Sequence, residues 1–353
     1  MDNKIKVLIV DDATFMVKAL RDILDSDHEI EVIGSARNGK DAVEKIKKLK
    51  PDVITLDVDM PVMDGIQAVR HIMIECPVPI VMLSSLFAHG DITFEALRLG
   101  VVDFLPKPSG AISTDIHTQR TELVDRVKLA SSIKLENVHR VKLHKVDSRE
   151  NLGSRYQYQS LDYLISIGTT LGGPGSIIRL LSSLPQDIPA AIVAMQDIQP
   201  KIIPEFVNQF DQFSSWKIEE GIGDIVLQQG TCYICSTRVP MVVDVNENNE
   251  PMLRQGESSQ APLNTLFSTA AELFEGHTVG VLMTGHGDDG KEGFAEIQRL
   301  GGVTLAQETS TCVYPNLTQC AIESGVVDRI VTVSDLASHL IDVVKQSAGS
   351  GVA

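Results

Sequence analysis

Acidic side chains follow short apolar segments in the first third of the chain, where strands are expected to end. Asp11 and Asp12 follow the segment 6–10, and Asp57 ends the segment 52–57. In a parallel sheet the carboxyl ends of the strands lie on one edge, which brings these carboxylates together. They repel one another unless a hard cation neutralises them, and Mg²⁺ prefers such oxygen ligands. The sequence therefore predicts a magnesium site in which one carboxylate can attack a phosphoryl group.

Two further polar side chains fall at the ends of later apolar segments. Ser84 ends the fourth segment and Lys107 follows the fifth. The Lys107 ammonium would share the charge of a transferring phosphoryl group with the metal, and the Ser84 hydroxyl would bond one of its oxygens. Taken singly, Asp11 or Asp12 could instead cap the helix that follows. The combination at strand ends favours phosphoryl chemistry.

The elements that must position these residues alternate regularly. Segments such as 14–26 and 39–49 place apolar residues at helical spacing between the apolar runs, and 121–133 is expected to be a last helix. This alternation predicts βαβ units, and hence a parallel sheet with right-handed crossovers. Residues 134–161 are polar and lack a period, which indicates a linker. The predicted strands are 6–10, 31–36, 52–57, 79–85 and 102–108.

The same rhythm restarts after the predicted linker and defines a second domain over 162–346. Residues 216–246 contain several short strands with turn residues, which predicts an antiparallel insertion. Residues 347–353 are expected to form a frayed tail. The other predicted elements are strands at 162–168, 190–196, 277–285 and 303–308, and helices at 173–184, 291–300 and 334–346.

Composition excludes several classes of protein. The formal charge of −16 argues against nucleic acid as a partner. No apolar stretch is long enough to insert into a membrane, and no secretory signal opens the chain. Five scattered cysteines do not suggest a disulfide framework, and the CxxC of Cys232 and Cys235 is interpreted as two reduced strand cysteines. A cytoplasmic location is expected.

A glycine-rich turn opens the second domain. Gly168-Thr169-Thr170-Leu171-Gly172-Gly173 follows the predicted strand and precedes a helix. A nucleotide-binding loop is one interpretation, but neither the GK[ST] ending of a P-loop nor GxGxxG spacing is present. The alternative is a nucleophile turn, with a hydroxyl held beside backbone amides that stabilise an oxyanion. Two other turns follow strands at Gln196-Asp197 and at 284–290.

The first domain resembles the receiver domains of two-component response regulators. The resemblance covers residues 1–133 and rests on Asp11-Asp12, Asp57, Met60-Pro61, Asp64-Gly65, Ser84 and Lys107-Pro108. It implies a CheA-like histidine kinase as phosphodonor and Asp57 as the phosphoacceptor. It also implies metal ligation by Asp11, Asp12, Asp57 and the backbone carbonyl of Asp59, a switch pair of Ser84 and Phe104, and a cis Lys107–Pro108 bond.

The second domain resembles the CheB chemotaxis methylesterases, whose three turns read roughly GASTGG, QH and TGMGxDG and carry a Ser/His/Asp triad. The resemblance also includes the segment 308–315. The expected fold is therefore α/β, with two doubly wound parallel-sheet domains. A flavodoxin-like receiver precedes a CheB methylesterase-like domain that has an antiparallel insertion.

This chain departs from that pattern at the reacting groups. Thr170 stands at the position of the nucleophilic serine and Asp197 at that of the histidine, whereas Asp289 is retained. The extra methyl of threonine crowds an attack. An ordinary carboxylate is a far poorer base than imidazole near neutral pH. His286, at the position of the methionine in TGMG, is the candidate substitute base.

A weaker alternative is a metal held by His286, Asp288, Asp289 and Asp197. We expect no cofactor in this domain. The leading hypothesis is a chemotaxis response regulator whose CheB-like domain binds a chemoreceptor or another chemosensory protein without hydrolysing it efficiently. The competing hypothesis is a phosphorylation-activated protein-glutamate methylesterase and glutamine deamidase. A transcriptional regulator is disfavoured by the acidic charge and by the lack of a DNA-binding helix pair.

Overall fold

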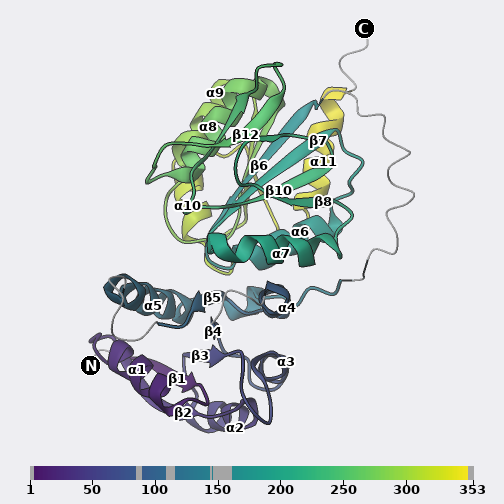
Figure 1. Ribbon diagram of the computed structural model, residues 1–353. Coiled ribbons are helices and arrows are strands. Elements are labelled where there is room, and N and C mark those ends of the chain that lie inside the picture. Colours follow the sequence, from purple (N-terminus) through teal and green to yellow (C-terminus); the bar gives the residue numbers. More distant parts are fainter. Residues whose placement is uncertain (1–3, 85–89, 109–115, 144, 146–160, 349–353) are drawn as a thin grey trace. The chain divides into compact units, whose positions relative to one another are not determined.

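The computed structural model describes residues 4–84, 90–108, 116–143, 145 and 161–348 (Figure 1). The chain divides between Arg140 and Val141 into two compact units. This division falls inside the predicted linker 134–161. The described part of that linker includes a 3₁₀ helix at Leu135–Asn137. The domain boundaries drawn from the sequence stay predictions.

The first unit is a parallel sheet of five strands in the order β2-β1-β3-β4-β5. This is the flavodoxin-like order, and it confirms the predicted fold. The strands are β1 Ile5–Val10, β2 Ile30–Ala36, β3 Val53–Asp57, β4 Ile80–Ser84 and β5 Asp103–Pro106. The helices are α1 Thr14–Leu24, α2 Gly39–Leu49, α3 Gly65–Glu75, α4 Gly90–Leu99 and α5 Ile116–Ser131.

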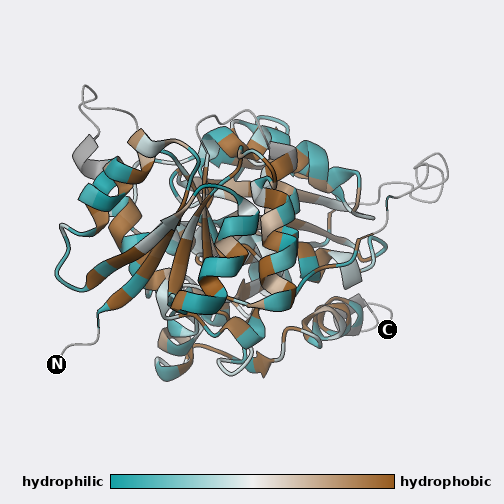
Figure 2. Cartoon of the chain, turned by 90° about the horizontal axis from the view of Figure 1, so that it is seen from below, coloured by the Kyte–Doolittle hydropathy of each residue, from teal (hydrophilic) through white to brown (hydrophobic). Residues whose placement is uncertain are grey.

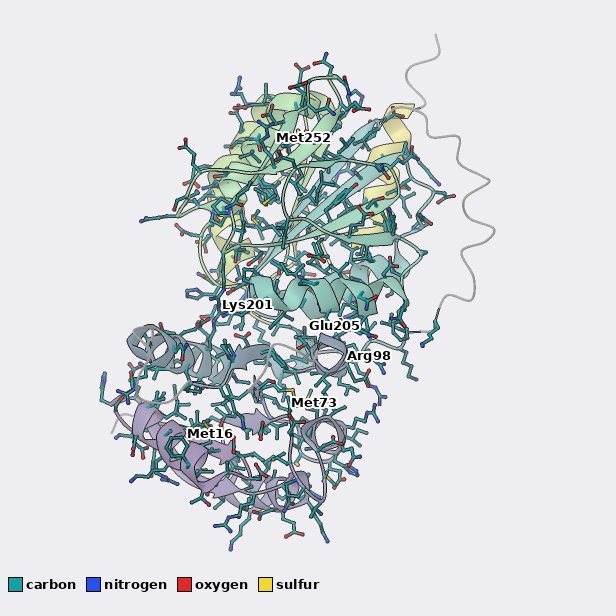
Figure 3. All side chains as sticks on the ribbon, in the orientation of Figure 1. Met16, Met73, Arg98, Lys201, Glu205 and Met252 are labelled. Atoms are coloured by element: carbon teal, nitrogen blue, oxygen red, sulfur yellow. The ribbon has the colours of Figure 1, made fainter. Side chains whose placement is uncertain are left out.

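The strands of this sheet are covered on both faces, which explains their continuous apolar sequences. Every residue of β3 and β4 is buried, and strands are predominantly brown in Figure 2. Helices α2 and α3 begin at capping side chains, since Asn38 and Asp64 accept hydrogen bonds from Asp41 N and Gln67 N. Met73 of α3 (Figure 3) lies close to Gly100. A Cβ placed on Gly100 would lie 2.9 Å from the Cε of Met73.

The second unit has a seven-stranded sheet in the order β15-β14-β13-β6-β7-β10-β8, in which all pairs are parallel. Its strands are β6 Tyr163–Thr169, β7 Ala190–Gln196, β8 Lys217–Glu220, β10 Thr231–Ser236, β13 Thr278–Leu282, β14 Val303–Gln307 and β15 Arg329–Val331. Its helices are α6 Gly173–Ser183, α7 Ile203–Asp211, α8 Pro262–Phe274, α9 Lys291–Arg299, α10 Asn316–Glu323 and α11 Leu336–Ala348, with 3₁₀ turns η3 Pro200–Ile202 and η4 Glu275–His277.

A separate antiparallel sheet joins β9 Ile225–Val226, β11 Met241–Val245 and β12 Pro251–Gln255. The insertion predicted over 216–246 was therefore wrong in its extent. Strands β8 and β10 from that range belong to the main parallel sheet. All six residues of β10 are buried, and burial on both faces is what a central parallel strand requires. Short strands and turn residues alone could not separate the two cases.

Two layers of helices cover the main sheet (Figure 1). Helices α8 and α9 lie on one face with the small sheet, and α6, α7 and α11 lie on the other. Helix α7 begins with a proline in its first turn and carries Glu205 there (Figure 3). Trp216 is fully buried and donates a hydrogen bond from Nε1 to Leu184 O at 2.9 Å. The apolar centre of the unit is therefore well defined.

Three smaller expectations can be compared with the structure. Helix α11 reaches Ala348, two residues beyond the helix end expected at 346, and 349–353 lie outside the described residues, so the tail stays a prediction. Cys232 and Cys235 are free and buried in β10, as predicted, and burial raises the pKa of both thiols. No helix among the described residues is long and apolar enough to span a membrane.

We predict that Phe206→Ala destabilises the second unit by about 3–5 kcal/mol, because it leaves a cavity in a closed core. Phe206 is fully buried and its ring lies edge-on to that of Phe210, with centroids 5.9 Å apart. Urea unfolding followed by the emission of Trp216, the only tryptophan of the chain, measures the change. The control is Phe15→Ala, since Phe15 is 71% exposed. Equal curves for wild type and Phe206→Ala would contradict the prediction.

Candidate functional site

Three carboxylates gather at the carboxyl edge of the first sheet. Asp11, Asp12 and Asp57 each offer one oxygen, and these oxygens lie within 4.8 Å of one another. Asp11 and Asp57 are buried, at 1% and 3% exposure, while Asp12 is exposed. Asp11 and Asp12 follow β1 and Asp57 ends β3, the two strands between which the strand order reverses. The sequence-predicted residues are thus brought together at the expected edge.

Lys107 completes this cluster. Its Nζ lies 2.7 Å from Asp11 Oδ2 and 2.8 Å from Asp57 Oδ2. Burial raises the pKa of Asp57 and outweighs the opposing effect of Lys107. Burial also disfavours charged Lys107, but its bonds to the two carboxylates prevail and raise its pKa. Three carboxylates against one ammonium leave two formal negative charges. An all-oxygen donor set with that charge fits a divalent cation such as Mg²⁺.

The remaining predicted receiver residues lie around this cluster. Ser84 ends β4 at 3% exposure, and its carbonyl accepts a hydrogen bond from Lys107 N at 2.7 Å. Phe104 is 9% exposed within β5. Asp59 is exposed two residues beyond β3, so only its backbone carbonyl remains a predicted ligand. No described peptide bond is cis, so the expectation for Lys107–Pro108 was wrong. A prolyl bond favours trans by only ~0.5–1 kcal/mol, and local sequence does not decide it.

Gly65 allows α3 to start directly against the phosphoacceptor strand. A Cβ at this position would lie 2.3 Å from Asp57 O and 2.9 Å from Val58 Cα. Its amide donates to Val58 O at 2.8 Å, while Asp64 caps the helix. The Asp64-Gly65 pair thus fixes the backbone that carries Asp57.

The second sheet assembles its own set of turns at the carboxyl edge. Thr170 follows β6 and Asp197 follows β7, and the two strands pair in register from Tyr163 opposite Ala190 to Thr169 opposite Gln196. The turn 284–290 follows β13, the other neighbour of β6. Because the strand order reverses between β6 and β13, this edge opens the crevice in which doubly wound proteins place their ligands.

The hydroxyl of Thr170 is engaged by the backbone of His286. Its Oγ1 donates to His286 O at 2.9 Å and accepts from His286 N at 2.6 Å. The imidazole lies against the ring of Tyr314, with centroids 5.7 Å apart. The hydroxyl proton is therefore directed at a carbonyl oxygen, which is no base, and the imidazole of His286 makes no hydrogen bond to Thr170 in the described structure.

The turn that carries His286 is tightly anchored. A Cβ at Gly285 would lie 2.4 Å from Thr170 Oγ1, so only glycine allows the two turns this close. Gly285 N donates to Tyr314 O at 2.9 Å, and Gly287 N donates to Asn316 Oδ1 at 2.7 Å. Tyr314, in the segment 308–315 noted in the sequence, and Asn316 just after it thus hold this turn in place.

Asp197 contacts an arginine. Its Oδ1 lies 3.6 Å from Arg238 Nε, and the two side chains are 16% and 33% exposed. Arg238 comes from the turn after β10, the strand that pairs with β7. A guanidinium therefore lies beside the carboxylate in the turn after β7.

Asp289 holds the start of α8. Its Oδ2 accepts from Leu263 N at 2.8 Å and its Oδ1 from Asn264 N at 3.0 Å. Burial raises the pKa of Asp289, although these backbone hydrogen bonds oppose the shift. Asn264 reciprocates, because its Oδ1 accepts from Gly290 N at 2.8 Å and from Gly293 N at 3.0 Å, where α9 begins. We call these two side chains the Asp289–Asn264 clip.

The alternative metal site in this unit is not assembled. Asp288 pairs with Lys291, with Oδ2 and Nζ 2.7 Å apart, and Asp289 bonds the amides of α8. Within the described residues, the one cluster of at least three candidate ligand residues is Asp11, Asp12 and Asp57.

Sequence reasoning missed three residues of this edge: Arg238, Asn264 and Asn316. Each acts across turns far apart in the chain, so no local spacing marks it. For Asn264 a signal existed, because it lies in the segment 261–265, which departs from the Arg-Pro-Ser-x-Asp pattern of the CheB methylesterases.

Family comparisons agree with this architecture. The family model described as response regulator receiver domain matches residues 7–116, and the one described as CheB methylesterase matches residues 165–340. The fold and the two edges thus define a response regulator with a receiver domain and a CheB methylesterase domain.

Similar proteins agree along the whole chain. A protein-glutamate methylesterase/protein-glutamine glutaminase of Pyrococcus horikoshii is 34% identical over 99% of this chain and 96% of its own length. One from Caldanaerobacter subterraneus subsp. tengcongensis is 34% identical over 99% of both. The crystal structure of the Thermotoga maritima CheB methylesterase catalytic domain is 25% identical, with a TM-score of 0.49, and covers 52% of this chain and 98% of that domain. The two relatives, each matched over nearly its whole length, show that the chain belongs to the CheB family.

We predict that Asp289→Ala destabilises the second unit by about 1–2 kcal/mol, because two backbone amides of α8 lose their acceptor. Urea unfolding followed by Trp216 emission measures the difference. Asp288→Ala is the matched control, since Asp288 is 70% exposed and pairs only with Lys291 among the described groups. A smaller effect at 289 than at 288 would contradict the role of Asp289 in the clip.

Proposed function

We propose that this protein is a chemotaxis response regulator that is phosphorylated on Asp57 and whose CheB-like domain binds a chemosensory partner without efficient ester hydrolysis. The observation that carries the second half is the bonding of Thr170. Its hydroxyl proton points at His286 O, and the neighbouring turn offers Asp197 beside Arg238 in place of an imidazole. A nucleophilic hydroxyl needs a base that can take its proton.

The receiver half of the proposal rests on the carboxylate cluster. Asp11, Asp12 and Asp57 would hold Mg²⁺, with the carbonyl of Asp59 as a further ligand. Mg²⁺ supplies positive charge that stabilises a transferring phosphoryl group. Lys107, already within 2.8 Å of Asp57, would contact the same group, and Ser84 with Phe104 would respond to it. The phosphodonor is a CheA-like histidine kinase.

The partner of the second domain follows from the relatives. Their name, protein-glutamate methylesterase/protein-glutamine glutaminase, specifies glutamate methyl esters and glutamines in proteins as substrates. We infer that this chain engages a chemoreceptor that carries such side chains. Phosphorylation would shift the population of receiver conformations and so change access to the edge at Thr170.

A second function is favoured by a specific observation. Relatives that match 99% of this chain bear the enzyme's name. A phosphorylation-activated methylesterase and deamidase would use Thr170 as nucleophile, and His286 as base after its imidazole leaves Tyr314. This alternative requires a rearrangement of the turn 284–290, which the contacts of Gly285 and Gly287 oppose.

We predict that acetyl phosphate with Mg²⁺ adds one phosphoryl group to the chain, because Asp57 lies in a cluster that binds the cation. Intact-mass spectrometry measures the addition. Chelation of Mg²⁺, and the substitution Asp57→Asn, should each abolish it. Asp52→Asn is the control, since Asp52 is exposed and five residues away in sequence. Undiminished labelling of Asp57→Asn would place the phosphoacceptor elsewhere.

We predict that the phosphorylated chain releases no more methanol from a methylated chemoreceptor than Thr170→Ala does. Any residual rate should stay within the ~10³–10⁴-fold advantage that binding and oxyanion stabilisation alone provide over water. Thr170→Ser serves as the matched variant and should also fail, because it restores a less crowded hydroxyl but no base.

Release that Thr170→Ala abolishes would instead establish the methylesterase. His286→Ala would then test the substitute base. Binding of the phosphorylated chain to the receptor, measured in the same samples, separates a binding module from a protein that does not recognise receptors.

A further inference from the structure

The turn that carries Arg238 is fastened to the turn that carries Asp197. Ser236 Oγ donates to Ile198 O at 2.6 Å, and Thr237 N donates to Gln196 O at 3.0 Å. Arg238 N in turn donates to Ser236 Oγ at 3.1 Å. These hydrogen bonds hold the backbone on both sides of the ion pair, so the backbone position of Arg238 is well defined.

The ion pair orients the guanidinium without hiding it. Asp197 is 16% exposed and lies 3.6 Å from Nε, while a third of the Arg238 side chain remains exposed. At 3.6 Å this contact is an ion pair rather than a hydrogen bond, and it draws the guanidinium toward Asp197. The planar guanidinium carries several donors, which suits directional recognition of a planar group.

Arg238 also stands close to the edge already described. Strands β6, β7 and β10 are consecutive neighbours, and Thr170, Asp197 and Arg238 follow them in that order. Two strand spacings amount to ~10 Å. A side chain that enters over Asp197 is therefore within reach of both Thr170 and Arg238.

The chemistry of a guanidinium selects among the forms of a glutamate side chain. Its donors match both oxygens of a free carboxylate, with charge assistance. A methyl ester carries no charge and its methyl group blocks one oxygen, and a primary amide turns one acceptor into a donor. Because Asp197 balances the charge of Arg238, the ion pair carries no net charge. The preference for a carboxylate over an ester or amide therefore rests on directed hydrogen bonds and is moderate.

We propose that Arg238 makes this edge a binding site for a free carboxylate, namely the unesterified glutamate side chain of the partner, rather than for its methyl ester. The proposal rests on the proposed function, because an efficient esterase would bind the ester as its substrate. It assigns Arg238 as the residue that determines specificity and Asp197 as the residue that positions it.

The test compares small probes on the full-length chain. N-acetylglutamate α-amide, its γ-methyl ester and N-acetylglutamine α-amide are titrated while amide resonances or heats are recorded. We expect the carboxylate to bind about tenfold more tightly than either neutral probe. Arg238→Gln should remove the preference and Arg238→Lys should keep part of it. Arg299→Gln is the matched control, since Arg299 is 63% exposed on α9.

Each outcome decides the proposal. An equal or higher affinity for the ester, a preference that survives Arg238→Gln, or no binding of any probe overturns it. Trp216 emission verifies that each variant is folded. Methanol released from the ester probe marks the failure of the proposed function separately, because the ranking of the probes can still be read in Thr170→Ala.

Discussion

Parallel strand pairing is the constraint on which both halves of this molecule depend. It sends every strand in the same direction, so residues separated by tens of positions in the chain meet at one edge. In the receiver this edge gathers Asp11, Asp57 and Lys107 from three strands or their ends. In the CheB-like unit it gathers Thr170, Asp197 and the turn 284–290. Chemistry then depends only on which side chains occupy these places.

The polar and charged side chains at the two edges find their partners in different ways. In the receiver, three carboxylates share one ammonium, and the excess negative charge calls for a ligand from outside. In the CheB-like unit each reactive position is satisfied from within the chain. Thr170 bonds a backbone, Asp197 meets Arg238, and Asp289 caps α8. An edge of the first kind is prepared for a cation, whereas at the second edge the hydroxyl of Thr170 donates to the backbone of His286.

The sequence predicted the parts of the molecule that follow from period and strand ends. The alternation of apolar and amphipathic segments predicted both parallel sheets. The acidic residues at the ends of the strands predicted the carboxylate cluster. Strands β8 and β10 were misassigned because short strands look alike in parallel and antiparallel sheets. The contacts of Asp197 and Asp289 were out of reach, since Arg238 and Asn264 lie 41 and 25 residues away along the chain and meet them only through the tertiary fold.

The Asp289–Asn264 clip bears on how enzymes are identified from sequence. Asp289 accepts hydrogen bonds at the start of α8, and Asn264 accepts hydrogen bonds at the start of α9. Together they connect the two helices independently of any reaction at this edge. Folding alone gives a reason to keep an aspartate at this place. A motif search that counts this aspartate as a catalytic residue therefore cannot separate its role in folding from a role in catalysis. The same ambiguity applies to any relative that has the aspartate without the histidine.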